Sequence, residues 1–334
     1  MVLSKEIAEQ SSSDTQLNEL SVNPEQKVFT SMEQLIANKN NPTPLLLLNE
    51  TINPNKDLKI FVKLEYLNPY GSIKDRTALY MLKHASYEKG QTLLEASSGN
   101  TAIALASLAP IFGLKMEVAV PERIPEDKKR ILKLLGVTEL WEAEDDLCPI
   151  FPNEGARGVV NGLLHSDGFE KFVNLNQYEN KANVLAHYEQ TGPEIWNQTD
   201  GKITHFYSTV GTGGTISGVG QFLKDQNESV KIIGVEPCDF SHNQYGMKKI
   251  SGLPEQYYPK IINKDVIDEL HSVTDEECYS LLRELLKNGY PFGVSTASAL
   301  KVALEQAKNG EKGMAVVIAA DNIFRYQSIF NDLE

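Results

Sequence analysis

The sequence predicts an α/β protein in which mainly parallel β-sheets are covered by helices. Along the chain, short apolar runs alternate with longer segments of helical periodicity. These short runs are apolar throughout, which is typical of strands buried on both faces of a parallel sheet. The length of 334 residues accommodates one large domain or two modest ones with real cores.

The N-terminal half contains three predicted strands, each followed by a predicted helix. The strands are apolar runs at residues 59–64, 92–95 and 116–120. The helices follow short turns rich in small or polar residues and cover residues 74–89, 100–112 and 126–135. Residues 1–40 are predicted to form an N-terminal extension, because the first 25 or so residues are polar.

The same alternation continues in the C-terminal half. The predicted strands are residues 203–207, 230–235 and 314–319, and the predicted helices are residues 215–224, 276–287 and 297–308. Residues 238–265 form the longest stretch without clear periodicity. Because long loops in compact domains are often functional, this stretch is a candidate part of the site.

Composition excludes several classes of function. The net charge is −13, which argues against binding to a nucleic-acid backbone. No apolar run reaches the roughly 18 residues of a membrane span, and the N-terminus lacks the apolar stretch of a secretory signal. Cys148, Cys238 and Cys278 lie far apart without metal-ligand spacing. We therefore expect no bound metal, no membrane partner and a cytoplasmic location.

The most informative single residue is Lys74, which follows the turn Asn68-Pro69-Tyr70-Gly71-Ser72 and opens a predicted helix. Only lysine supplies the amine that holds the aldehyde of pyridoxal phosphate (PLP). The dipole of a helix N-terminus and desolvation both favour a neutral amine there. An isolated lysine is usually a solvated surface residue, so this interpretation depends on two further segments.

The first segment is a glycine-rich loop between a predicted strand and a predicted helix. Its residues are Gly211, Thr212, Gly213, Gly214 and Thr215. Glycines let backbone N–H groups approach an anion closely, and the threonines add hydroxyl donors, so the loop is a candidate phosphate site. The spacing matches neither the GxGxxG dinucleotide motif nor the P-loop. A tight structural turn is the alternative.

The second segment also connects a strand to a helix, and it consists of Ser97, Ser98, Gly99, Asn100 and Thr101. Its hydroxyl and N–H groups are suited to a substrate carboxylate, and Asn100 to the ring oxygen of PLP. The alternative is a helix cap formed by Ser98 or Asn100.

Together these motifs resemble the cysteine synthase and cystathionine β-synthase family of fold type II PLP enzymes. The resemblance runs from about Thr43 to Tyr326. Its matching segments are TPL (43–45), KLE (63–65), NPYGSIKDR (68–76), SSGNT (97–101), NEGARG (153–158), Gln177, TGPEIW (191–196), GTGGTISGVG (211–220), GVEP (234–237) and GVSTASAL (293–300).

The resemblance assigns a role to each matching position. It implies that Lys74 holds PLP and acts as the base at Cα, and that Asn100 meets the 3′-oxygen of the cofactor. It further implies that residues 211–215 hold the phosphate and that Ser295 binds the pyridine nitrogen. The residues implied for the substrate α-carboxylate are Ser97, Ser98, Asn100, Thr101 and Gln177.

The family's reaction is a β-replacement on an O-activated L-serine through an aminoacrylate intermediate. In this reading sulfide adds to give L-cysteine. The fold implied is a two-domain enzyme resembling the tryptophan synthase β-subunit. Residues 68–180 would form a smaller mobile domain, and residues 41–67 with 181–334 a larger domain that binds the PLP phosphate. A homodimer is also implied.

The sequence departs from the family at three places. The carboxylate loop begins with Ser97, Ala297 replaces a glycine after Ser295, and the segment before Arg325 and Tyr326 lacks the usual glycine and acidic residue. In the loop at 242–260, Lys248 aligns with the position where O-phosphoserine enzymes place a cation. It is a candidate to neutralise a leaving group, although an exposed lysine is the alternative.

Several alternatives for the reaction stay open. The nucleophile is sulfide, homocysteine or an amino acid amine as in siderophore precursor synthesis, and the leaving group is acetyl, phosphate or hydroxyl. A threonine synthase or dehydratase is a further alternative, and so is a non-catalytic regulatory homologue. The intact Lys74 and both loops favour an active enzyme.

Overall fold

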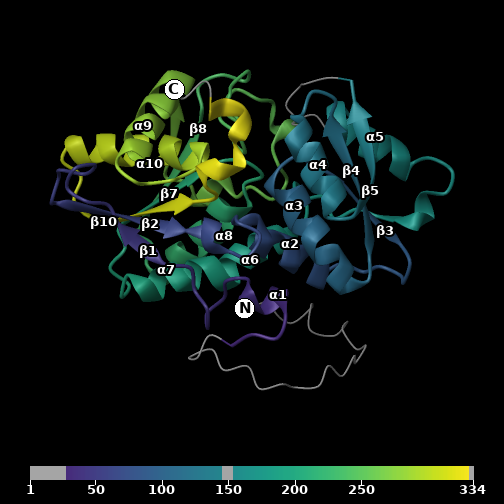
Figure 1. Cartoon of the computed structure of the whole chain (residues 1–334). Helices are drawn as coiled ribbons and strands as arrows, with labels where there is room; N and C mark the ends of the chain where they lie inside the picture. The colour runs from purple at the N-terminus through teal and green to yellow at the C-terminus, as the bar shows by residue number, and fades with distance from the viewer. Residues whose placement is uncertain (1–27, 145–152, 331–334) are drawn as a thin grey trace.

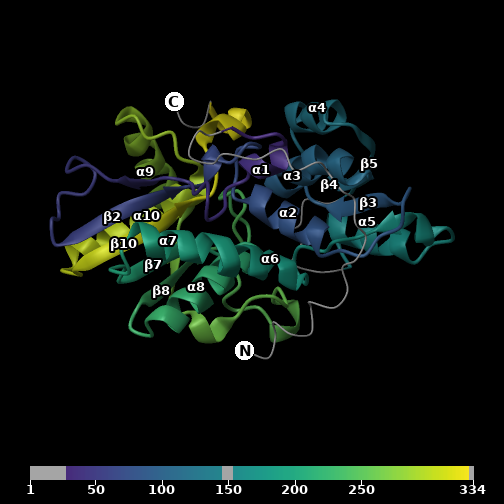
Figure 2. The ribbon, with the colours of Figure 1, turned by 90° about the horizontal axis from the view of Figure 1, so that it is seen from below.

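The computed structural model describes residues 28–144 and 153–330, which form two helix-covered β-sheets (Figure 1). The predicted α/β class is therefore confirmed. Cys148 and most of the predicted N-terminal extension lie outside the described residues. Figures 1 and 2 show the two sheets side by side, with α2 at the junction between them.

The larger sheet has six strands in the order β1-β2-β10-β7-β8-β9. Only β1 runs antiparallel to its neighbour, and all other pairs are parallel. The strands are β1 (Leu45–Leu47), β2 (Leu58–Leu64), β7 (His205–Thr209), β8 (Lys231–Pro237), β9 (Glu269–Val273) and β10 (Gly313–Ala319).

The strand β10 shows how the larger sheet builds two cores. Ala315 and Val317 pack on one face with α9 (Asp275–Lys287) and α10 (Val294–Lys308). Val316 and Ile318 pack on the other face with α7 (Gly192–Gln198) and α8 (Gly214–Gln226). Since successive side chains of a strand point to opposite faces, one apolar run serves both cores.

The smaller sheet has four parallel strands in the order β5-β4-β3-β6. They are β3 (Thr92–Ala96), β4 (Lys115–Pro121), β5 (Val137–Ala143) and β6 (Phe172–Val173). One face packs on α2 (Lys74–Lys83), α3 (Asn100–Leu108) and α4 (Glu126–Leu134), and the other packs on α5 (Gly155–Leu164). The remaining helices are α1 (Met32–Leu35) and α6 (Lys181–Ala186).

Helix boundaries differ from the sequence-based prediction at several places, most clearly in α2, α3 and α10. The helix α3 ends at Leu108, and residues 109–112 continue as a 3-10 helix. The predicted end of the first helix at residue 89 is wrong, because α2 ends at Lys83 and His84 leaves helical geometry. The ring of His84 lies 2.8 Å from the carbonyl oxygen of Tyr80, which caps the last turn. The helix α10 begins at Val294 rather than at residue 297, so Ser295 lies in its first turn.

The prediction also missed the strands β1, β5, β6 and β9. The strand β5 carries exposed polar residues such as Glu139, and β9 alternates half-buried and exposed residues. Both lie at sheet edges, where one side of a strand meets solvent. The search for apolar runs in the sequence therefore identifies central strands and misses strands at the edges of a sheet.

Nothing in the described part of the chain indicates a membrane span or a metal site. Residues 28–144 and 153–330 contain no helix long and apolar enough to cross a membrane. The same residues contain no cluster of His, Cys, Asp and Glu suited to a metal ion. Cys238 is half-buried and Cys278 is buried, and both are free thiols.

Candidate active site

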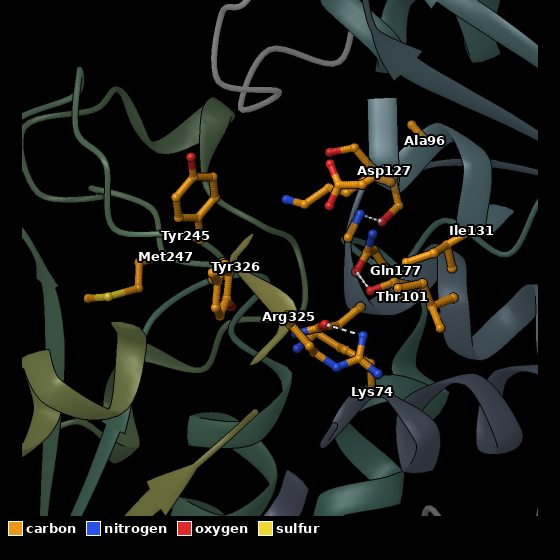
Figure 3. A pocket seen from close by; sticks show the side chains of 18 of the residues that line it. Lys74, Ala96, Thr101, Asp127, Ile131, Gln177, Tyr245, Met247, Arg325 and Tyr326 are labelled. Carbon is orange, nitrogen blue, oxygen red and sulfur yellow. Dashed lines mark hydrogen bonds between the residues drawn. The ribbon is translucent and has the colours of Figure 1, made fainter. Parts of the chain in front are cut away.

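A cavity of about 710 Å³ collects most of the predicted site residues (Figure 3). It opens where β3 and β7 end, and the carboxyl ends of parallel strands are where α/β proteins usually bind ligands. The predicted residues that line it are Lys74, Ser97, Ser98, Asn100, Thr101, Gln177, Gly211, Thr212 and Lys248. The predicted residues outside its lining are Gly213, Gly214, Thr215 and Ser295.

Lys74 is the first residue of α2, directly after a tight turn. Gly71 adopts φ +83° in that turn, and a Cβ there would lie 2.9 Å from the Arg325 guanidinium. The Ser72 hydroxyl accepts a hydrogen bond from the Lys74 backbone N–H at 3.2 Å. Burial lowers the pKa of the Lys74 amine, while the Asp321 carboxylate opposes that shift. Both the position and the environment favour a neutral amine.

A buried ionic network anchors the start of α2. The Arg76 guanidinium contacts Glu65 at 2.7 Å and Glu194 at 2.6 Å. Lys63 contacts Glu194 at 2.7 Å, and all four side chains are at most 1 % exposed. Burial would raise the pKa of Glu65, but Arg76, Lys63 and Thr43 outweigh it and lower this pKa to about 2. The network therefore fixes Lys74 relative to β2 and α7.

The glycine-rich loop leads from β7 into α8. Within the described residues, the backbone N–H groups of residues 211–215 have no backbone or side-chain acceptor. Gly213 adopts φ +87°, and a Cβ at Gly214 would lie 2.1 Å from the Asn183 amide oxygen. Because α8 is 13 residues long, its N-terminus adds a positive dipole end to these donors. The loop is thus built to receive an anion.

His187 supports this loop from behind, and sequence reasoning assigned it no role. Its Nε2 lies 3.3 Å from the hydroxyls of both Thr215 and Thr77. Burial, together with the nearby Lys74 and Arg76, lowers the pKa of His187 to about 3. The ring is therefore neutral near pH 7 and links the glycine-rich loop to α2.

The carboxylate loop packs against Gln177. The Thr101 hydroxyl donates to the Gln177 side-chain oxygen at 2.8 Å. The predicted capping alternative named Ser98 or Asn100, but neither caps α3. Instead the Ser97 hydroxyl accepts from the N–H groups of Gly99 at 3.4 Å and Ala102 at 3.3 Å. Ser97 thus shapes the loop, while Ser98 lines the cavity.

Asn100 is held by the C-terminal segment. Its amide nitrogen donates to Asp321 at 2.6 Å, and its oxygen accepts from Arg325 at 3.0 Å. Arg325 also donates to the carbonyls of Gly71 and Tyr70, and Tyr326 donates to Asp321. These contacts tie the smaller sheet's first loop to the end of β10. This segment departs from the family pattern, which is why sequence reasoning gave Asp321 and Arg325 no role.

Lys248 and Ser295 occupy different surroundings. Lys248 is 8 % exposed, lines the cavity, and places its ammonium 5.7 Å from the Tyr178 ring centre. The alternative of an exposed lysine is therefore wrong. Lys260, in the same loop, instead pairs with Glu179 at 2.7 Å. Ser295 is buried at the N-terminus of α10.

Comparison with known proteins places this site in a family. Residues 36–321 match the family model described as "Pyridoxal-phosphate dependent enzyme". Cysteine synthase from Aquifex aeolicus is 36% identical over 322 residues, covering 92% of this chain and 94% of that protein. The O-acetylserine dependent cystathionine beta-synthase of Bacillus subtilis is 33% identical over 310 residues, covering 90% of this chain and 97% of that protein.

A solved structure shows the same fold. The crystal structure of cysteine synthase from Entamoeba histolytica superposes with a TM-score of 0.81 at 29% identity, covering 93% of this chain and 92% of that one. The residues present also fit PLP: a half-buried lysine amine faces the cavity, and a loop with unpaired N–H groups stands ready for a phosphate. The chain therefore belongs to the pyridoxal-phosphate dependent enzymes, in the family of cysteine synthase and cystathionine β-synthase.

Proposed function

We propose that this protein catalyses a PLP-dependent β-replacement on an O-activated L-serine, in which sulfide adds to give L-cysteine. The observation that carries the proposal is one cavity that combines a lysine amine whose pKa is lowered by burial, a loop suited to a carboxylate and a loop suited to a phosphate. The amine supplies a base, the Ser97 loop binds the carboxylate of the amino acid, and the glycine-rich loop binds the phosphate of the cofactor.

The binding residues divide by the group that they hold. Residues 211–215 would take the PLP phosphate through their N–H groups and the hydroxyls of Thr212 and Thr215. The free N–H of the Asn100 amide would meet the 3′-oxygen, and the Ser295 hydroxyl the pyridine nitrogen. The substrate carboxylate would be held by Ser97, Ser98, Asn100, Thr101 and Gln177.

Lys74 carries the proton chemistry. Bound PLP supplies the electron sink that stabilises negative charge at the substrate Cα. The neutral Lys74 amine would hold the cofactor's aldehyde carbon before the substrate arrives, and then take the Cα proton. Lys248 would neutralise the departing acetate or phosphate, which leaves with the electron pair of the Cβ–O bond.

The larger architecture is proposed on the same basis. Residues 68–180 would move as a smaller domain against residues 41–67 and 181–334, so that carboxylate binding at the Ser97 loop closes the cavity. Residues 1–40 would form an extension, and the enzyme would be a cytoplasmic homodimer. These proposals rest on the family resemblance.

A second candidate keeps the chemistry and changes the nucleophile. The Bacillus subtilis relative is named for an O-acetylserine dependent cystathionine synthesis, so homocysteine is a reasonable second substrate. An amino acid amine is a third option of the same kind. These nucleophiles need space and charge beyond the requirements of sulfide.

The test is a spectral titration of the holoenzyme with O-acetylserine and, separately, with O-phosphoserine. We expect one donor to change the visible band of bound PLP and sulfide to reverse the change, which identifies the leaving group. Lys74→Ala should abolish the response. A band that neither donor changes would contradict the proposed donor, and a protein that binds no PLP would contradict the enzyme.

A further inference from the structure

The cavity is cationic although the chain carries a net charge of −13. Its charged lining residues are Lys74, Lys128, Arg130, Lys248, Arg325 and the single carboxylate Asp127. The proposed function assigns Lys74 to the base and Lys248 to the leaving group. Arg325 is occupied by Asn100 and two backbone carbonyls. The two remaining cations, Lys128 and Arg130 on α4, have no role in the proposed function, so their presence in the cavity needs another explanation.

Lys128 is half-buried, whereas Arg130, the other α4 cation of the lining, is exposed. Its ammonium lies 4.9 Å from the ring centre of Tyr245 and 5.9 Å from that of Tyr326. No carboxylate lies within ion-pair distance of Lys128 in the described parts of the chain. A half-buried ammonium that lies over two aromatic rings and forms no ion pair within residues 28–144 and 153–330 is available to an anionic ligand.

Its neighbours place Lys128 near the reacting centre. Tyr326, which lies under the ammonium, donates a hydrogen bond to Asp321. Asp321 in turn accepts from Asn100 and acts electrostatically on both Lys74 and Lys128. Lys128 thus lies against the aromatic rings of Tyr245 and Tyr326, and the Asp321 carboxylate acts on its ammonium as it does on the Lys74 amine.

Two apolar side chains of α4 also line the cavity. Ile131 and Leu134 follow Lys128 at helical spacing, line the same cavity, and are 42% and 81% exposed. A ligand with a carboxylate on a short aliphatic chain would place its charge at Lys128 and its apolar part against Ile131 and Leu134. Sulfide has no second group that would use either feature.

We propose that Lys128 binds the carboxylate of a second nucleophile, so that the enzyme accepts, in addition to sulfide, a thiol or amine bearing a carboxylate on a short apolar chain. This inference rests on the proposed β-replacement and extends its range of nucleophiles. The donor's Cβ–O bond breaks and its electrons leave with the acetate or phosphate. The nucleophile's S or N bonds to Cβ and releases its proton to solvent, and Lys74 returns a proton to Cα.

The experiment compares two thiols with the same two-carbon spacer, 3-mercaptopropionate, which ends in a carboxylate, and 2-mercaptoethanol, which ends in a neutral hydroxyl. With the wild-type holoenzyme and the preferred donor, we expect a lower KM for 3-mercaptopropionate. Lys128→Gln should raise that KM about tenfold, the effect of losing one charged hydrogen bond, and leave the KM for 2-mercaptoethanol and sulfide unchanged. Lys128→Arg should restore the preference.

Lys129→Gln is the matched control, because Lys129 is the next residue on α4 and pairs with Glu142 at 2.6 Å outside the cavity. Equal effects of Lys128→Gln on both thiols, or no effect, would overturn the proposal. A changed donor response in Lys128→Gln would overturn it too, by assigning Lys128 to the leaving group.

Failure of the proposed function gives a different result. In that case the wild-type holoenzyme shows no spectral response to either donor, whatever the thiol. Calorimetric titration of 3-mercaptopropionate into the holoenzyme then still tests Lys128, because binding needs no turnover. Binding that Lys128→Gln weakens supports the carboxylate site, and binding that this variant leaves unchanged refutes it.

Discussion

Both ends of the Asn100 amide are fixed by residues more than 200 positions away in the sequence. Asp321 accepts from the nitrogen and Arg325 donates to the oxygen, so the amide has one orientation. That orientation determines where its remaining N–H points. The contact between Asn100 and the cofactor was predicted from the SSGNT motif alone. It therefore also depends on Asp321 and Arg325, which lie in a segment without a recognisable motif.

Asp321→Ala should weaken PLP binding, because Asn100 then loses its acceptor and its fixed orientation. We expect the dissociation constant of PLP to rise about tenfold, as for loss of a charged hydrogen bond. Cofactor fluorescence during titration of the apoenzyme measures it. Asp127→Ala, which removes the carboxylate that lines the cavity without contacting Asn100, is the control and should bind PLP as the wild type does.

Glu95 makes stability depend on pH. Its carboxylate accepts from the Asn176 N–H at 3.1 Å and supports the turn that carries Gln177, where Asn176 adopts φ +47°. Burial raises the pKa of Glu95 from 4.5 to about 7, against these hydrogen bonds. The folded protein therefore keeps a proton that the unfolded chain loses in this range. The free energy of unfolding should fall by about 3 kcal/mol as pH rises from 4.5 to 7.

Glu95→Gln should remove this part of the pH dependence, because the amide oxygen still accepts but the group does not ionise. Denaturant unfolding at pH 5 and pH 8 measures the difference. Glu139→Gln, at an exposed position of β5, should leave the pH dependence as it is. If Glu95→Gln unfolds with the wild-type pH dependence, Glu95 is ionised in the folded state.

At the scale of elements, α2 is positioned by buried charges at its start as well as by its apolar face, which packs on the smaller sheet. Arg76 contacts Glu65 in the turn after β2 and Glu194 in α7, and Lys63 of β2 also contacts Glu194. The sequence motifs KLE, KDR and TGPEIW each contribute to it. Sequence reasoning identified the motifs, but not that their charges meet.

Glu194→Ala should destabilise the protein by about 3–5 kcal/mol, because it leaves Arg76 and Lys63 buried with too little compensating charge. Chemical denaturation monitored by circular dichroism gives the value. Glu126→Ala removes an 86% exposed partner of Lys129 at 3.6 Å and should cost less than about 1 kcal/mol. Similar values for both variants would mean that the buried network is not needed.

A helix or strand could be predicted from the sequence where its own residues carry a clear hydrophobic pattern. The central strands β3, β4, β7, β8 and β10 and most helix starts follow from apolar runs and polar turns. The edges β5 and β9 mix polar and apolar residues, because one side meets solvent. Lys74 and both loops were likewise found from short motifs. Lys128 and Tyr245 were not, since only the fold brings their segments together.

At the scale of the whole molecule, the cavity lies at the boundary between the two sheets, so its shape depends on how they are placed. The Ser97 loop and α4 belong to the smaller sheet. The glycine-rich loop, Tyr245 and the C-terminal segment belong to the larger one. A ligand that touches both groups is expected to draw them together.

Donor binding should therefore slow amide hydrogen exchange in residues 97–101 and in α4, and leave β8 unchanged. Hydrogen-exchange mass spectrometry of the holoenzyme with and without donor measures this difference. Lys74→Ala, loaded with PLP, is the control for chemistry, because closure driven by the carboxylate alone should persist in it. Uniform slowing across both sheets would contradict closure and indicate general stabilisation.

The alternation of β10 between two cores has one more consequence, which concerns insertions and deletions. Adding one residue to this strand would exchange Val316 and Ile318 with Ala315 and Val317, so that larger side chains would press on α9 and α10 and smaller ones would face α7 and α8. The same shift would displace Asp321 and Arg325, which follow the strand and hold Asn100. The length of the chain from β10 to Arg325 therefore matters both for packing and for the site, and insertions or deletions are expected outside this segment.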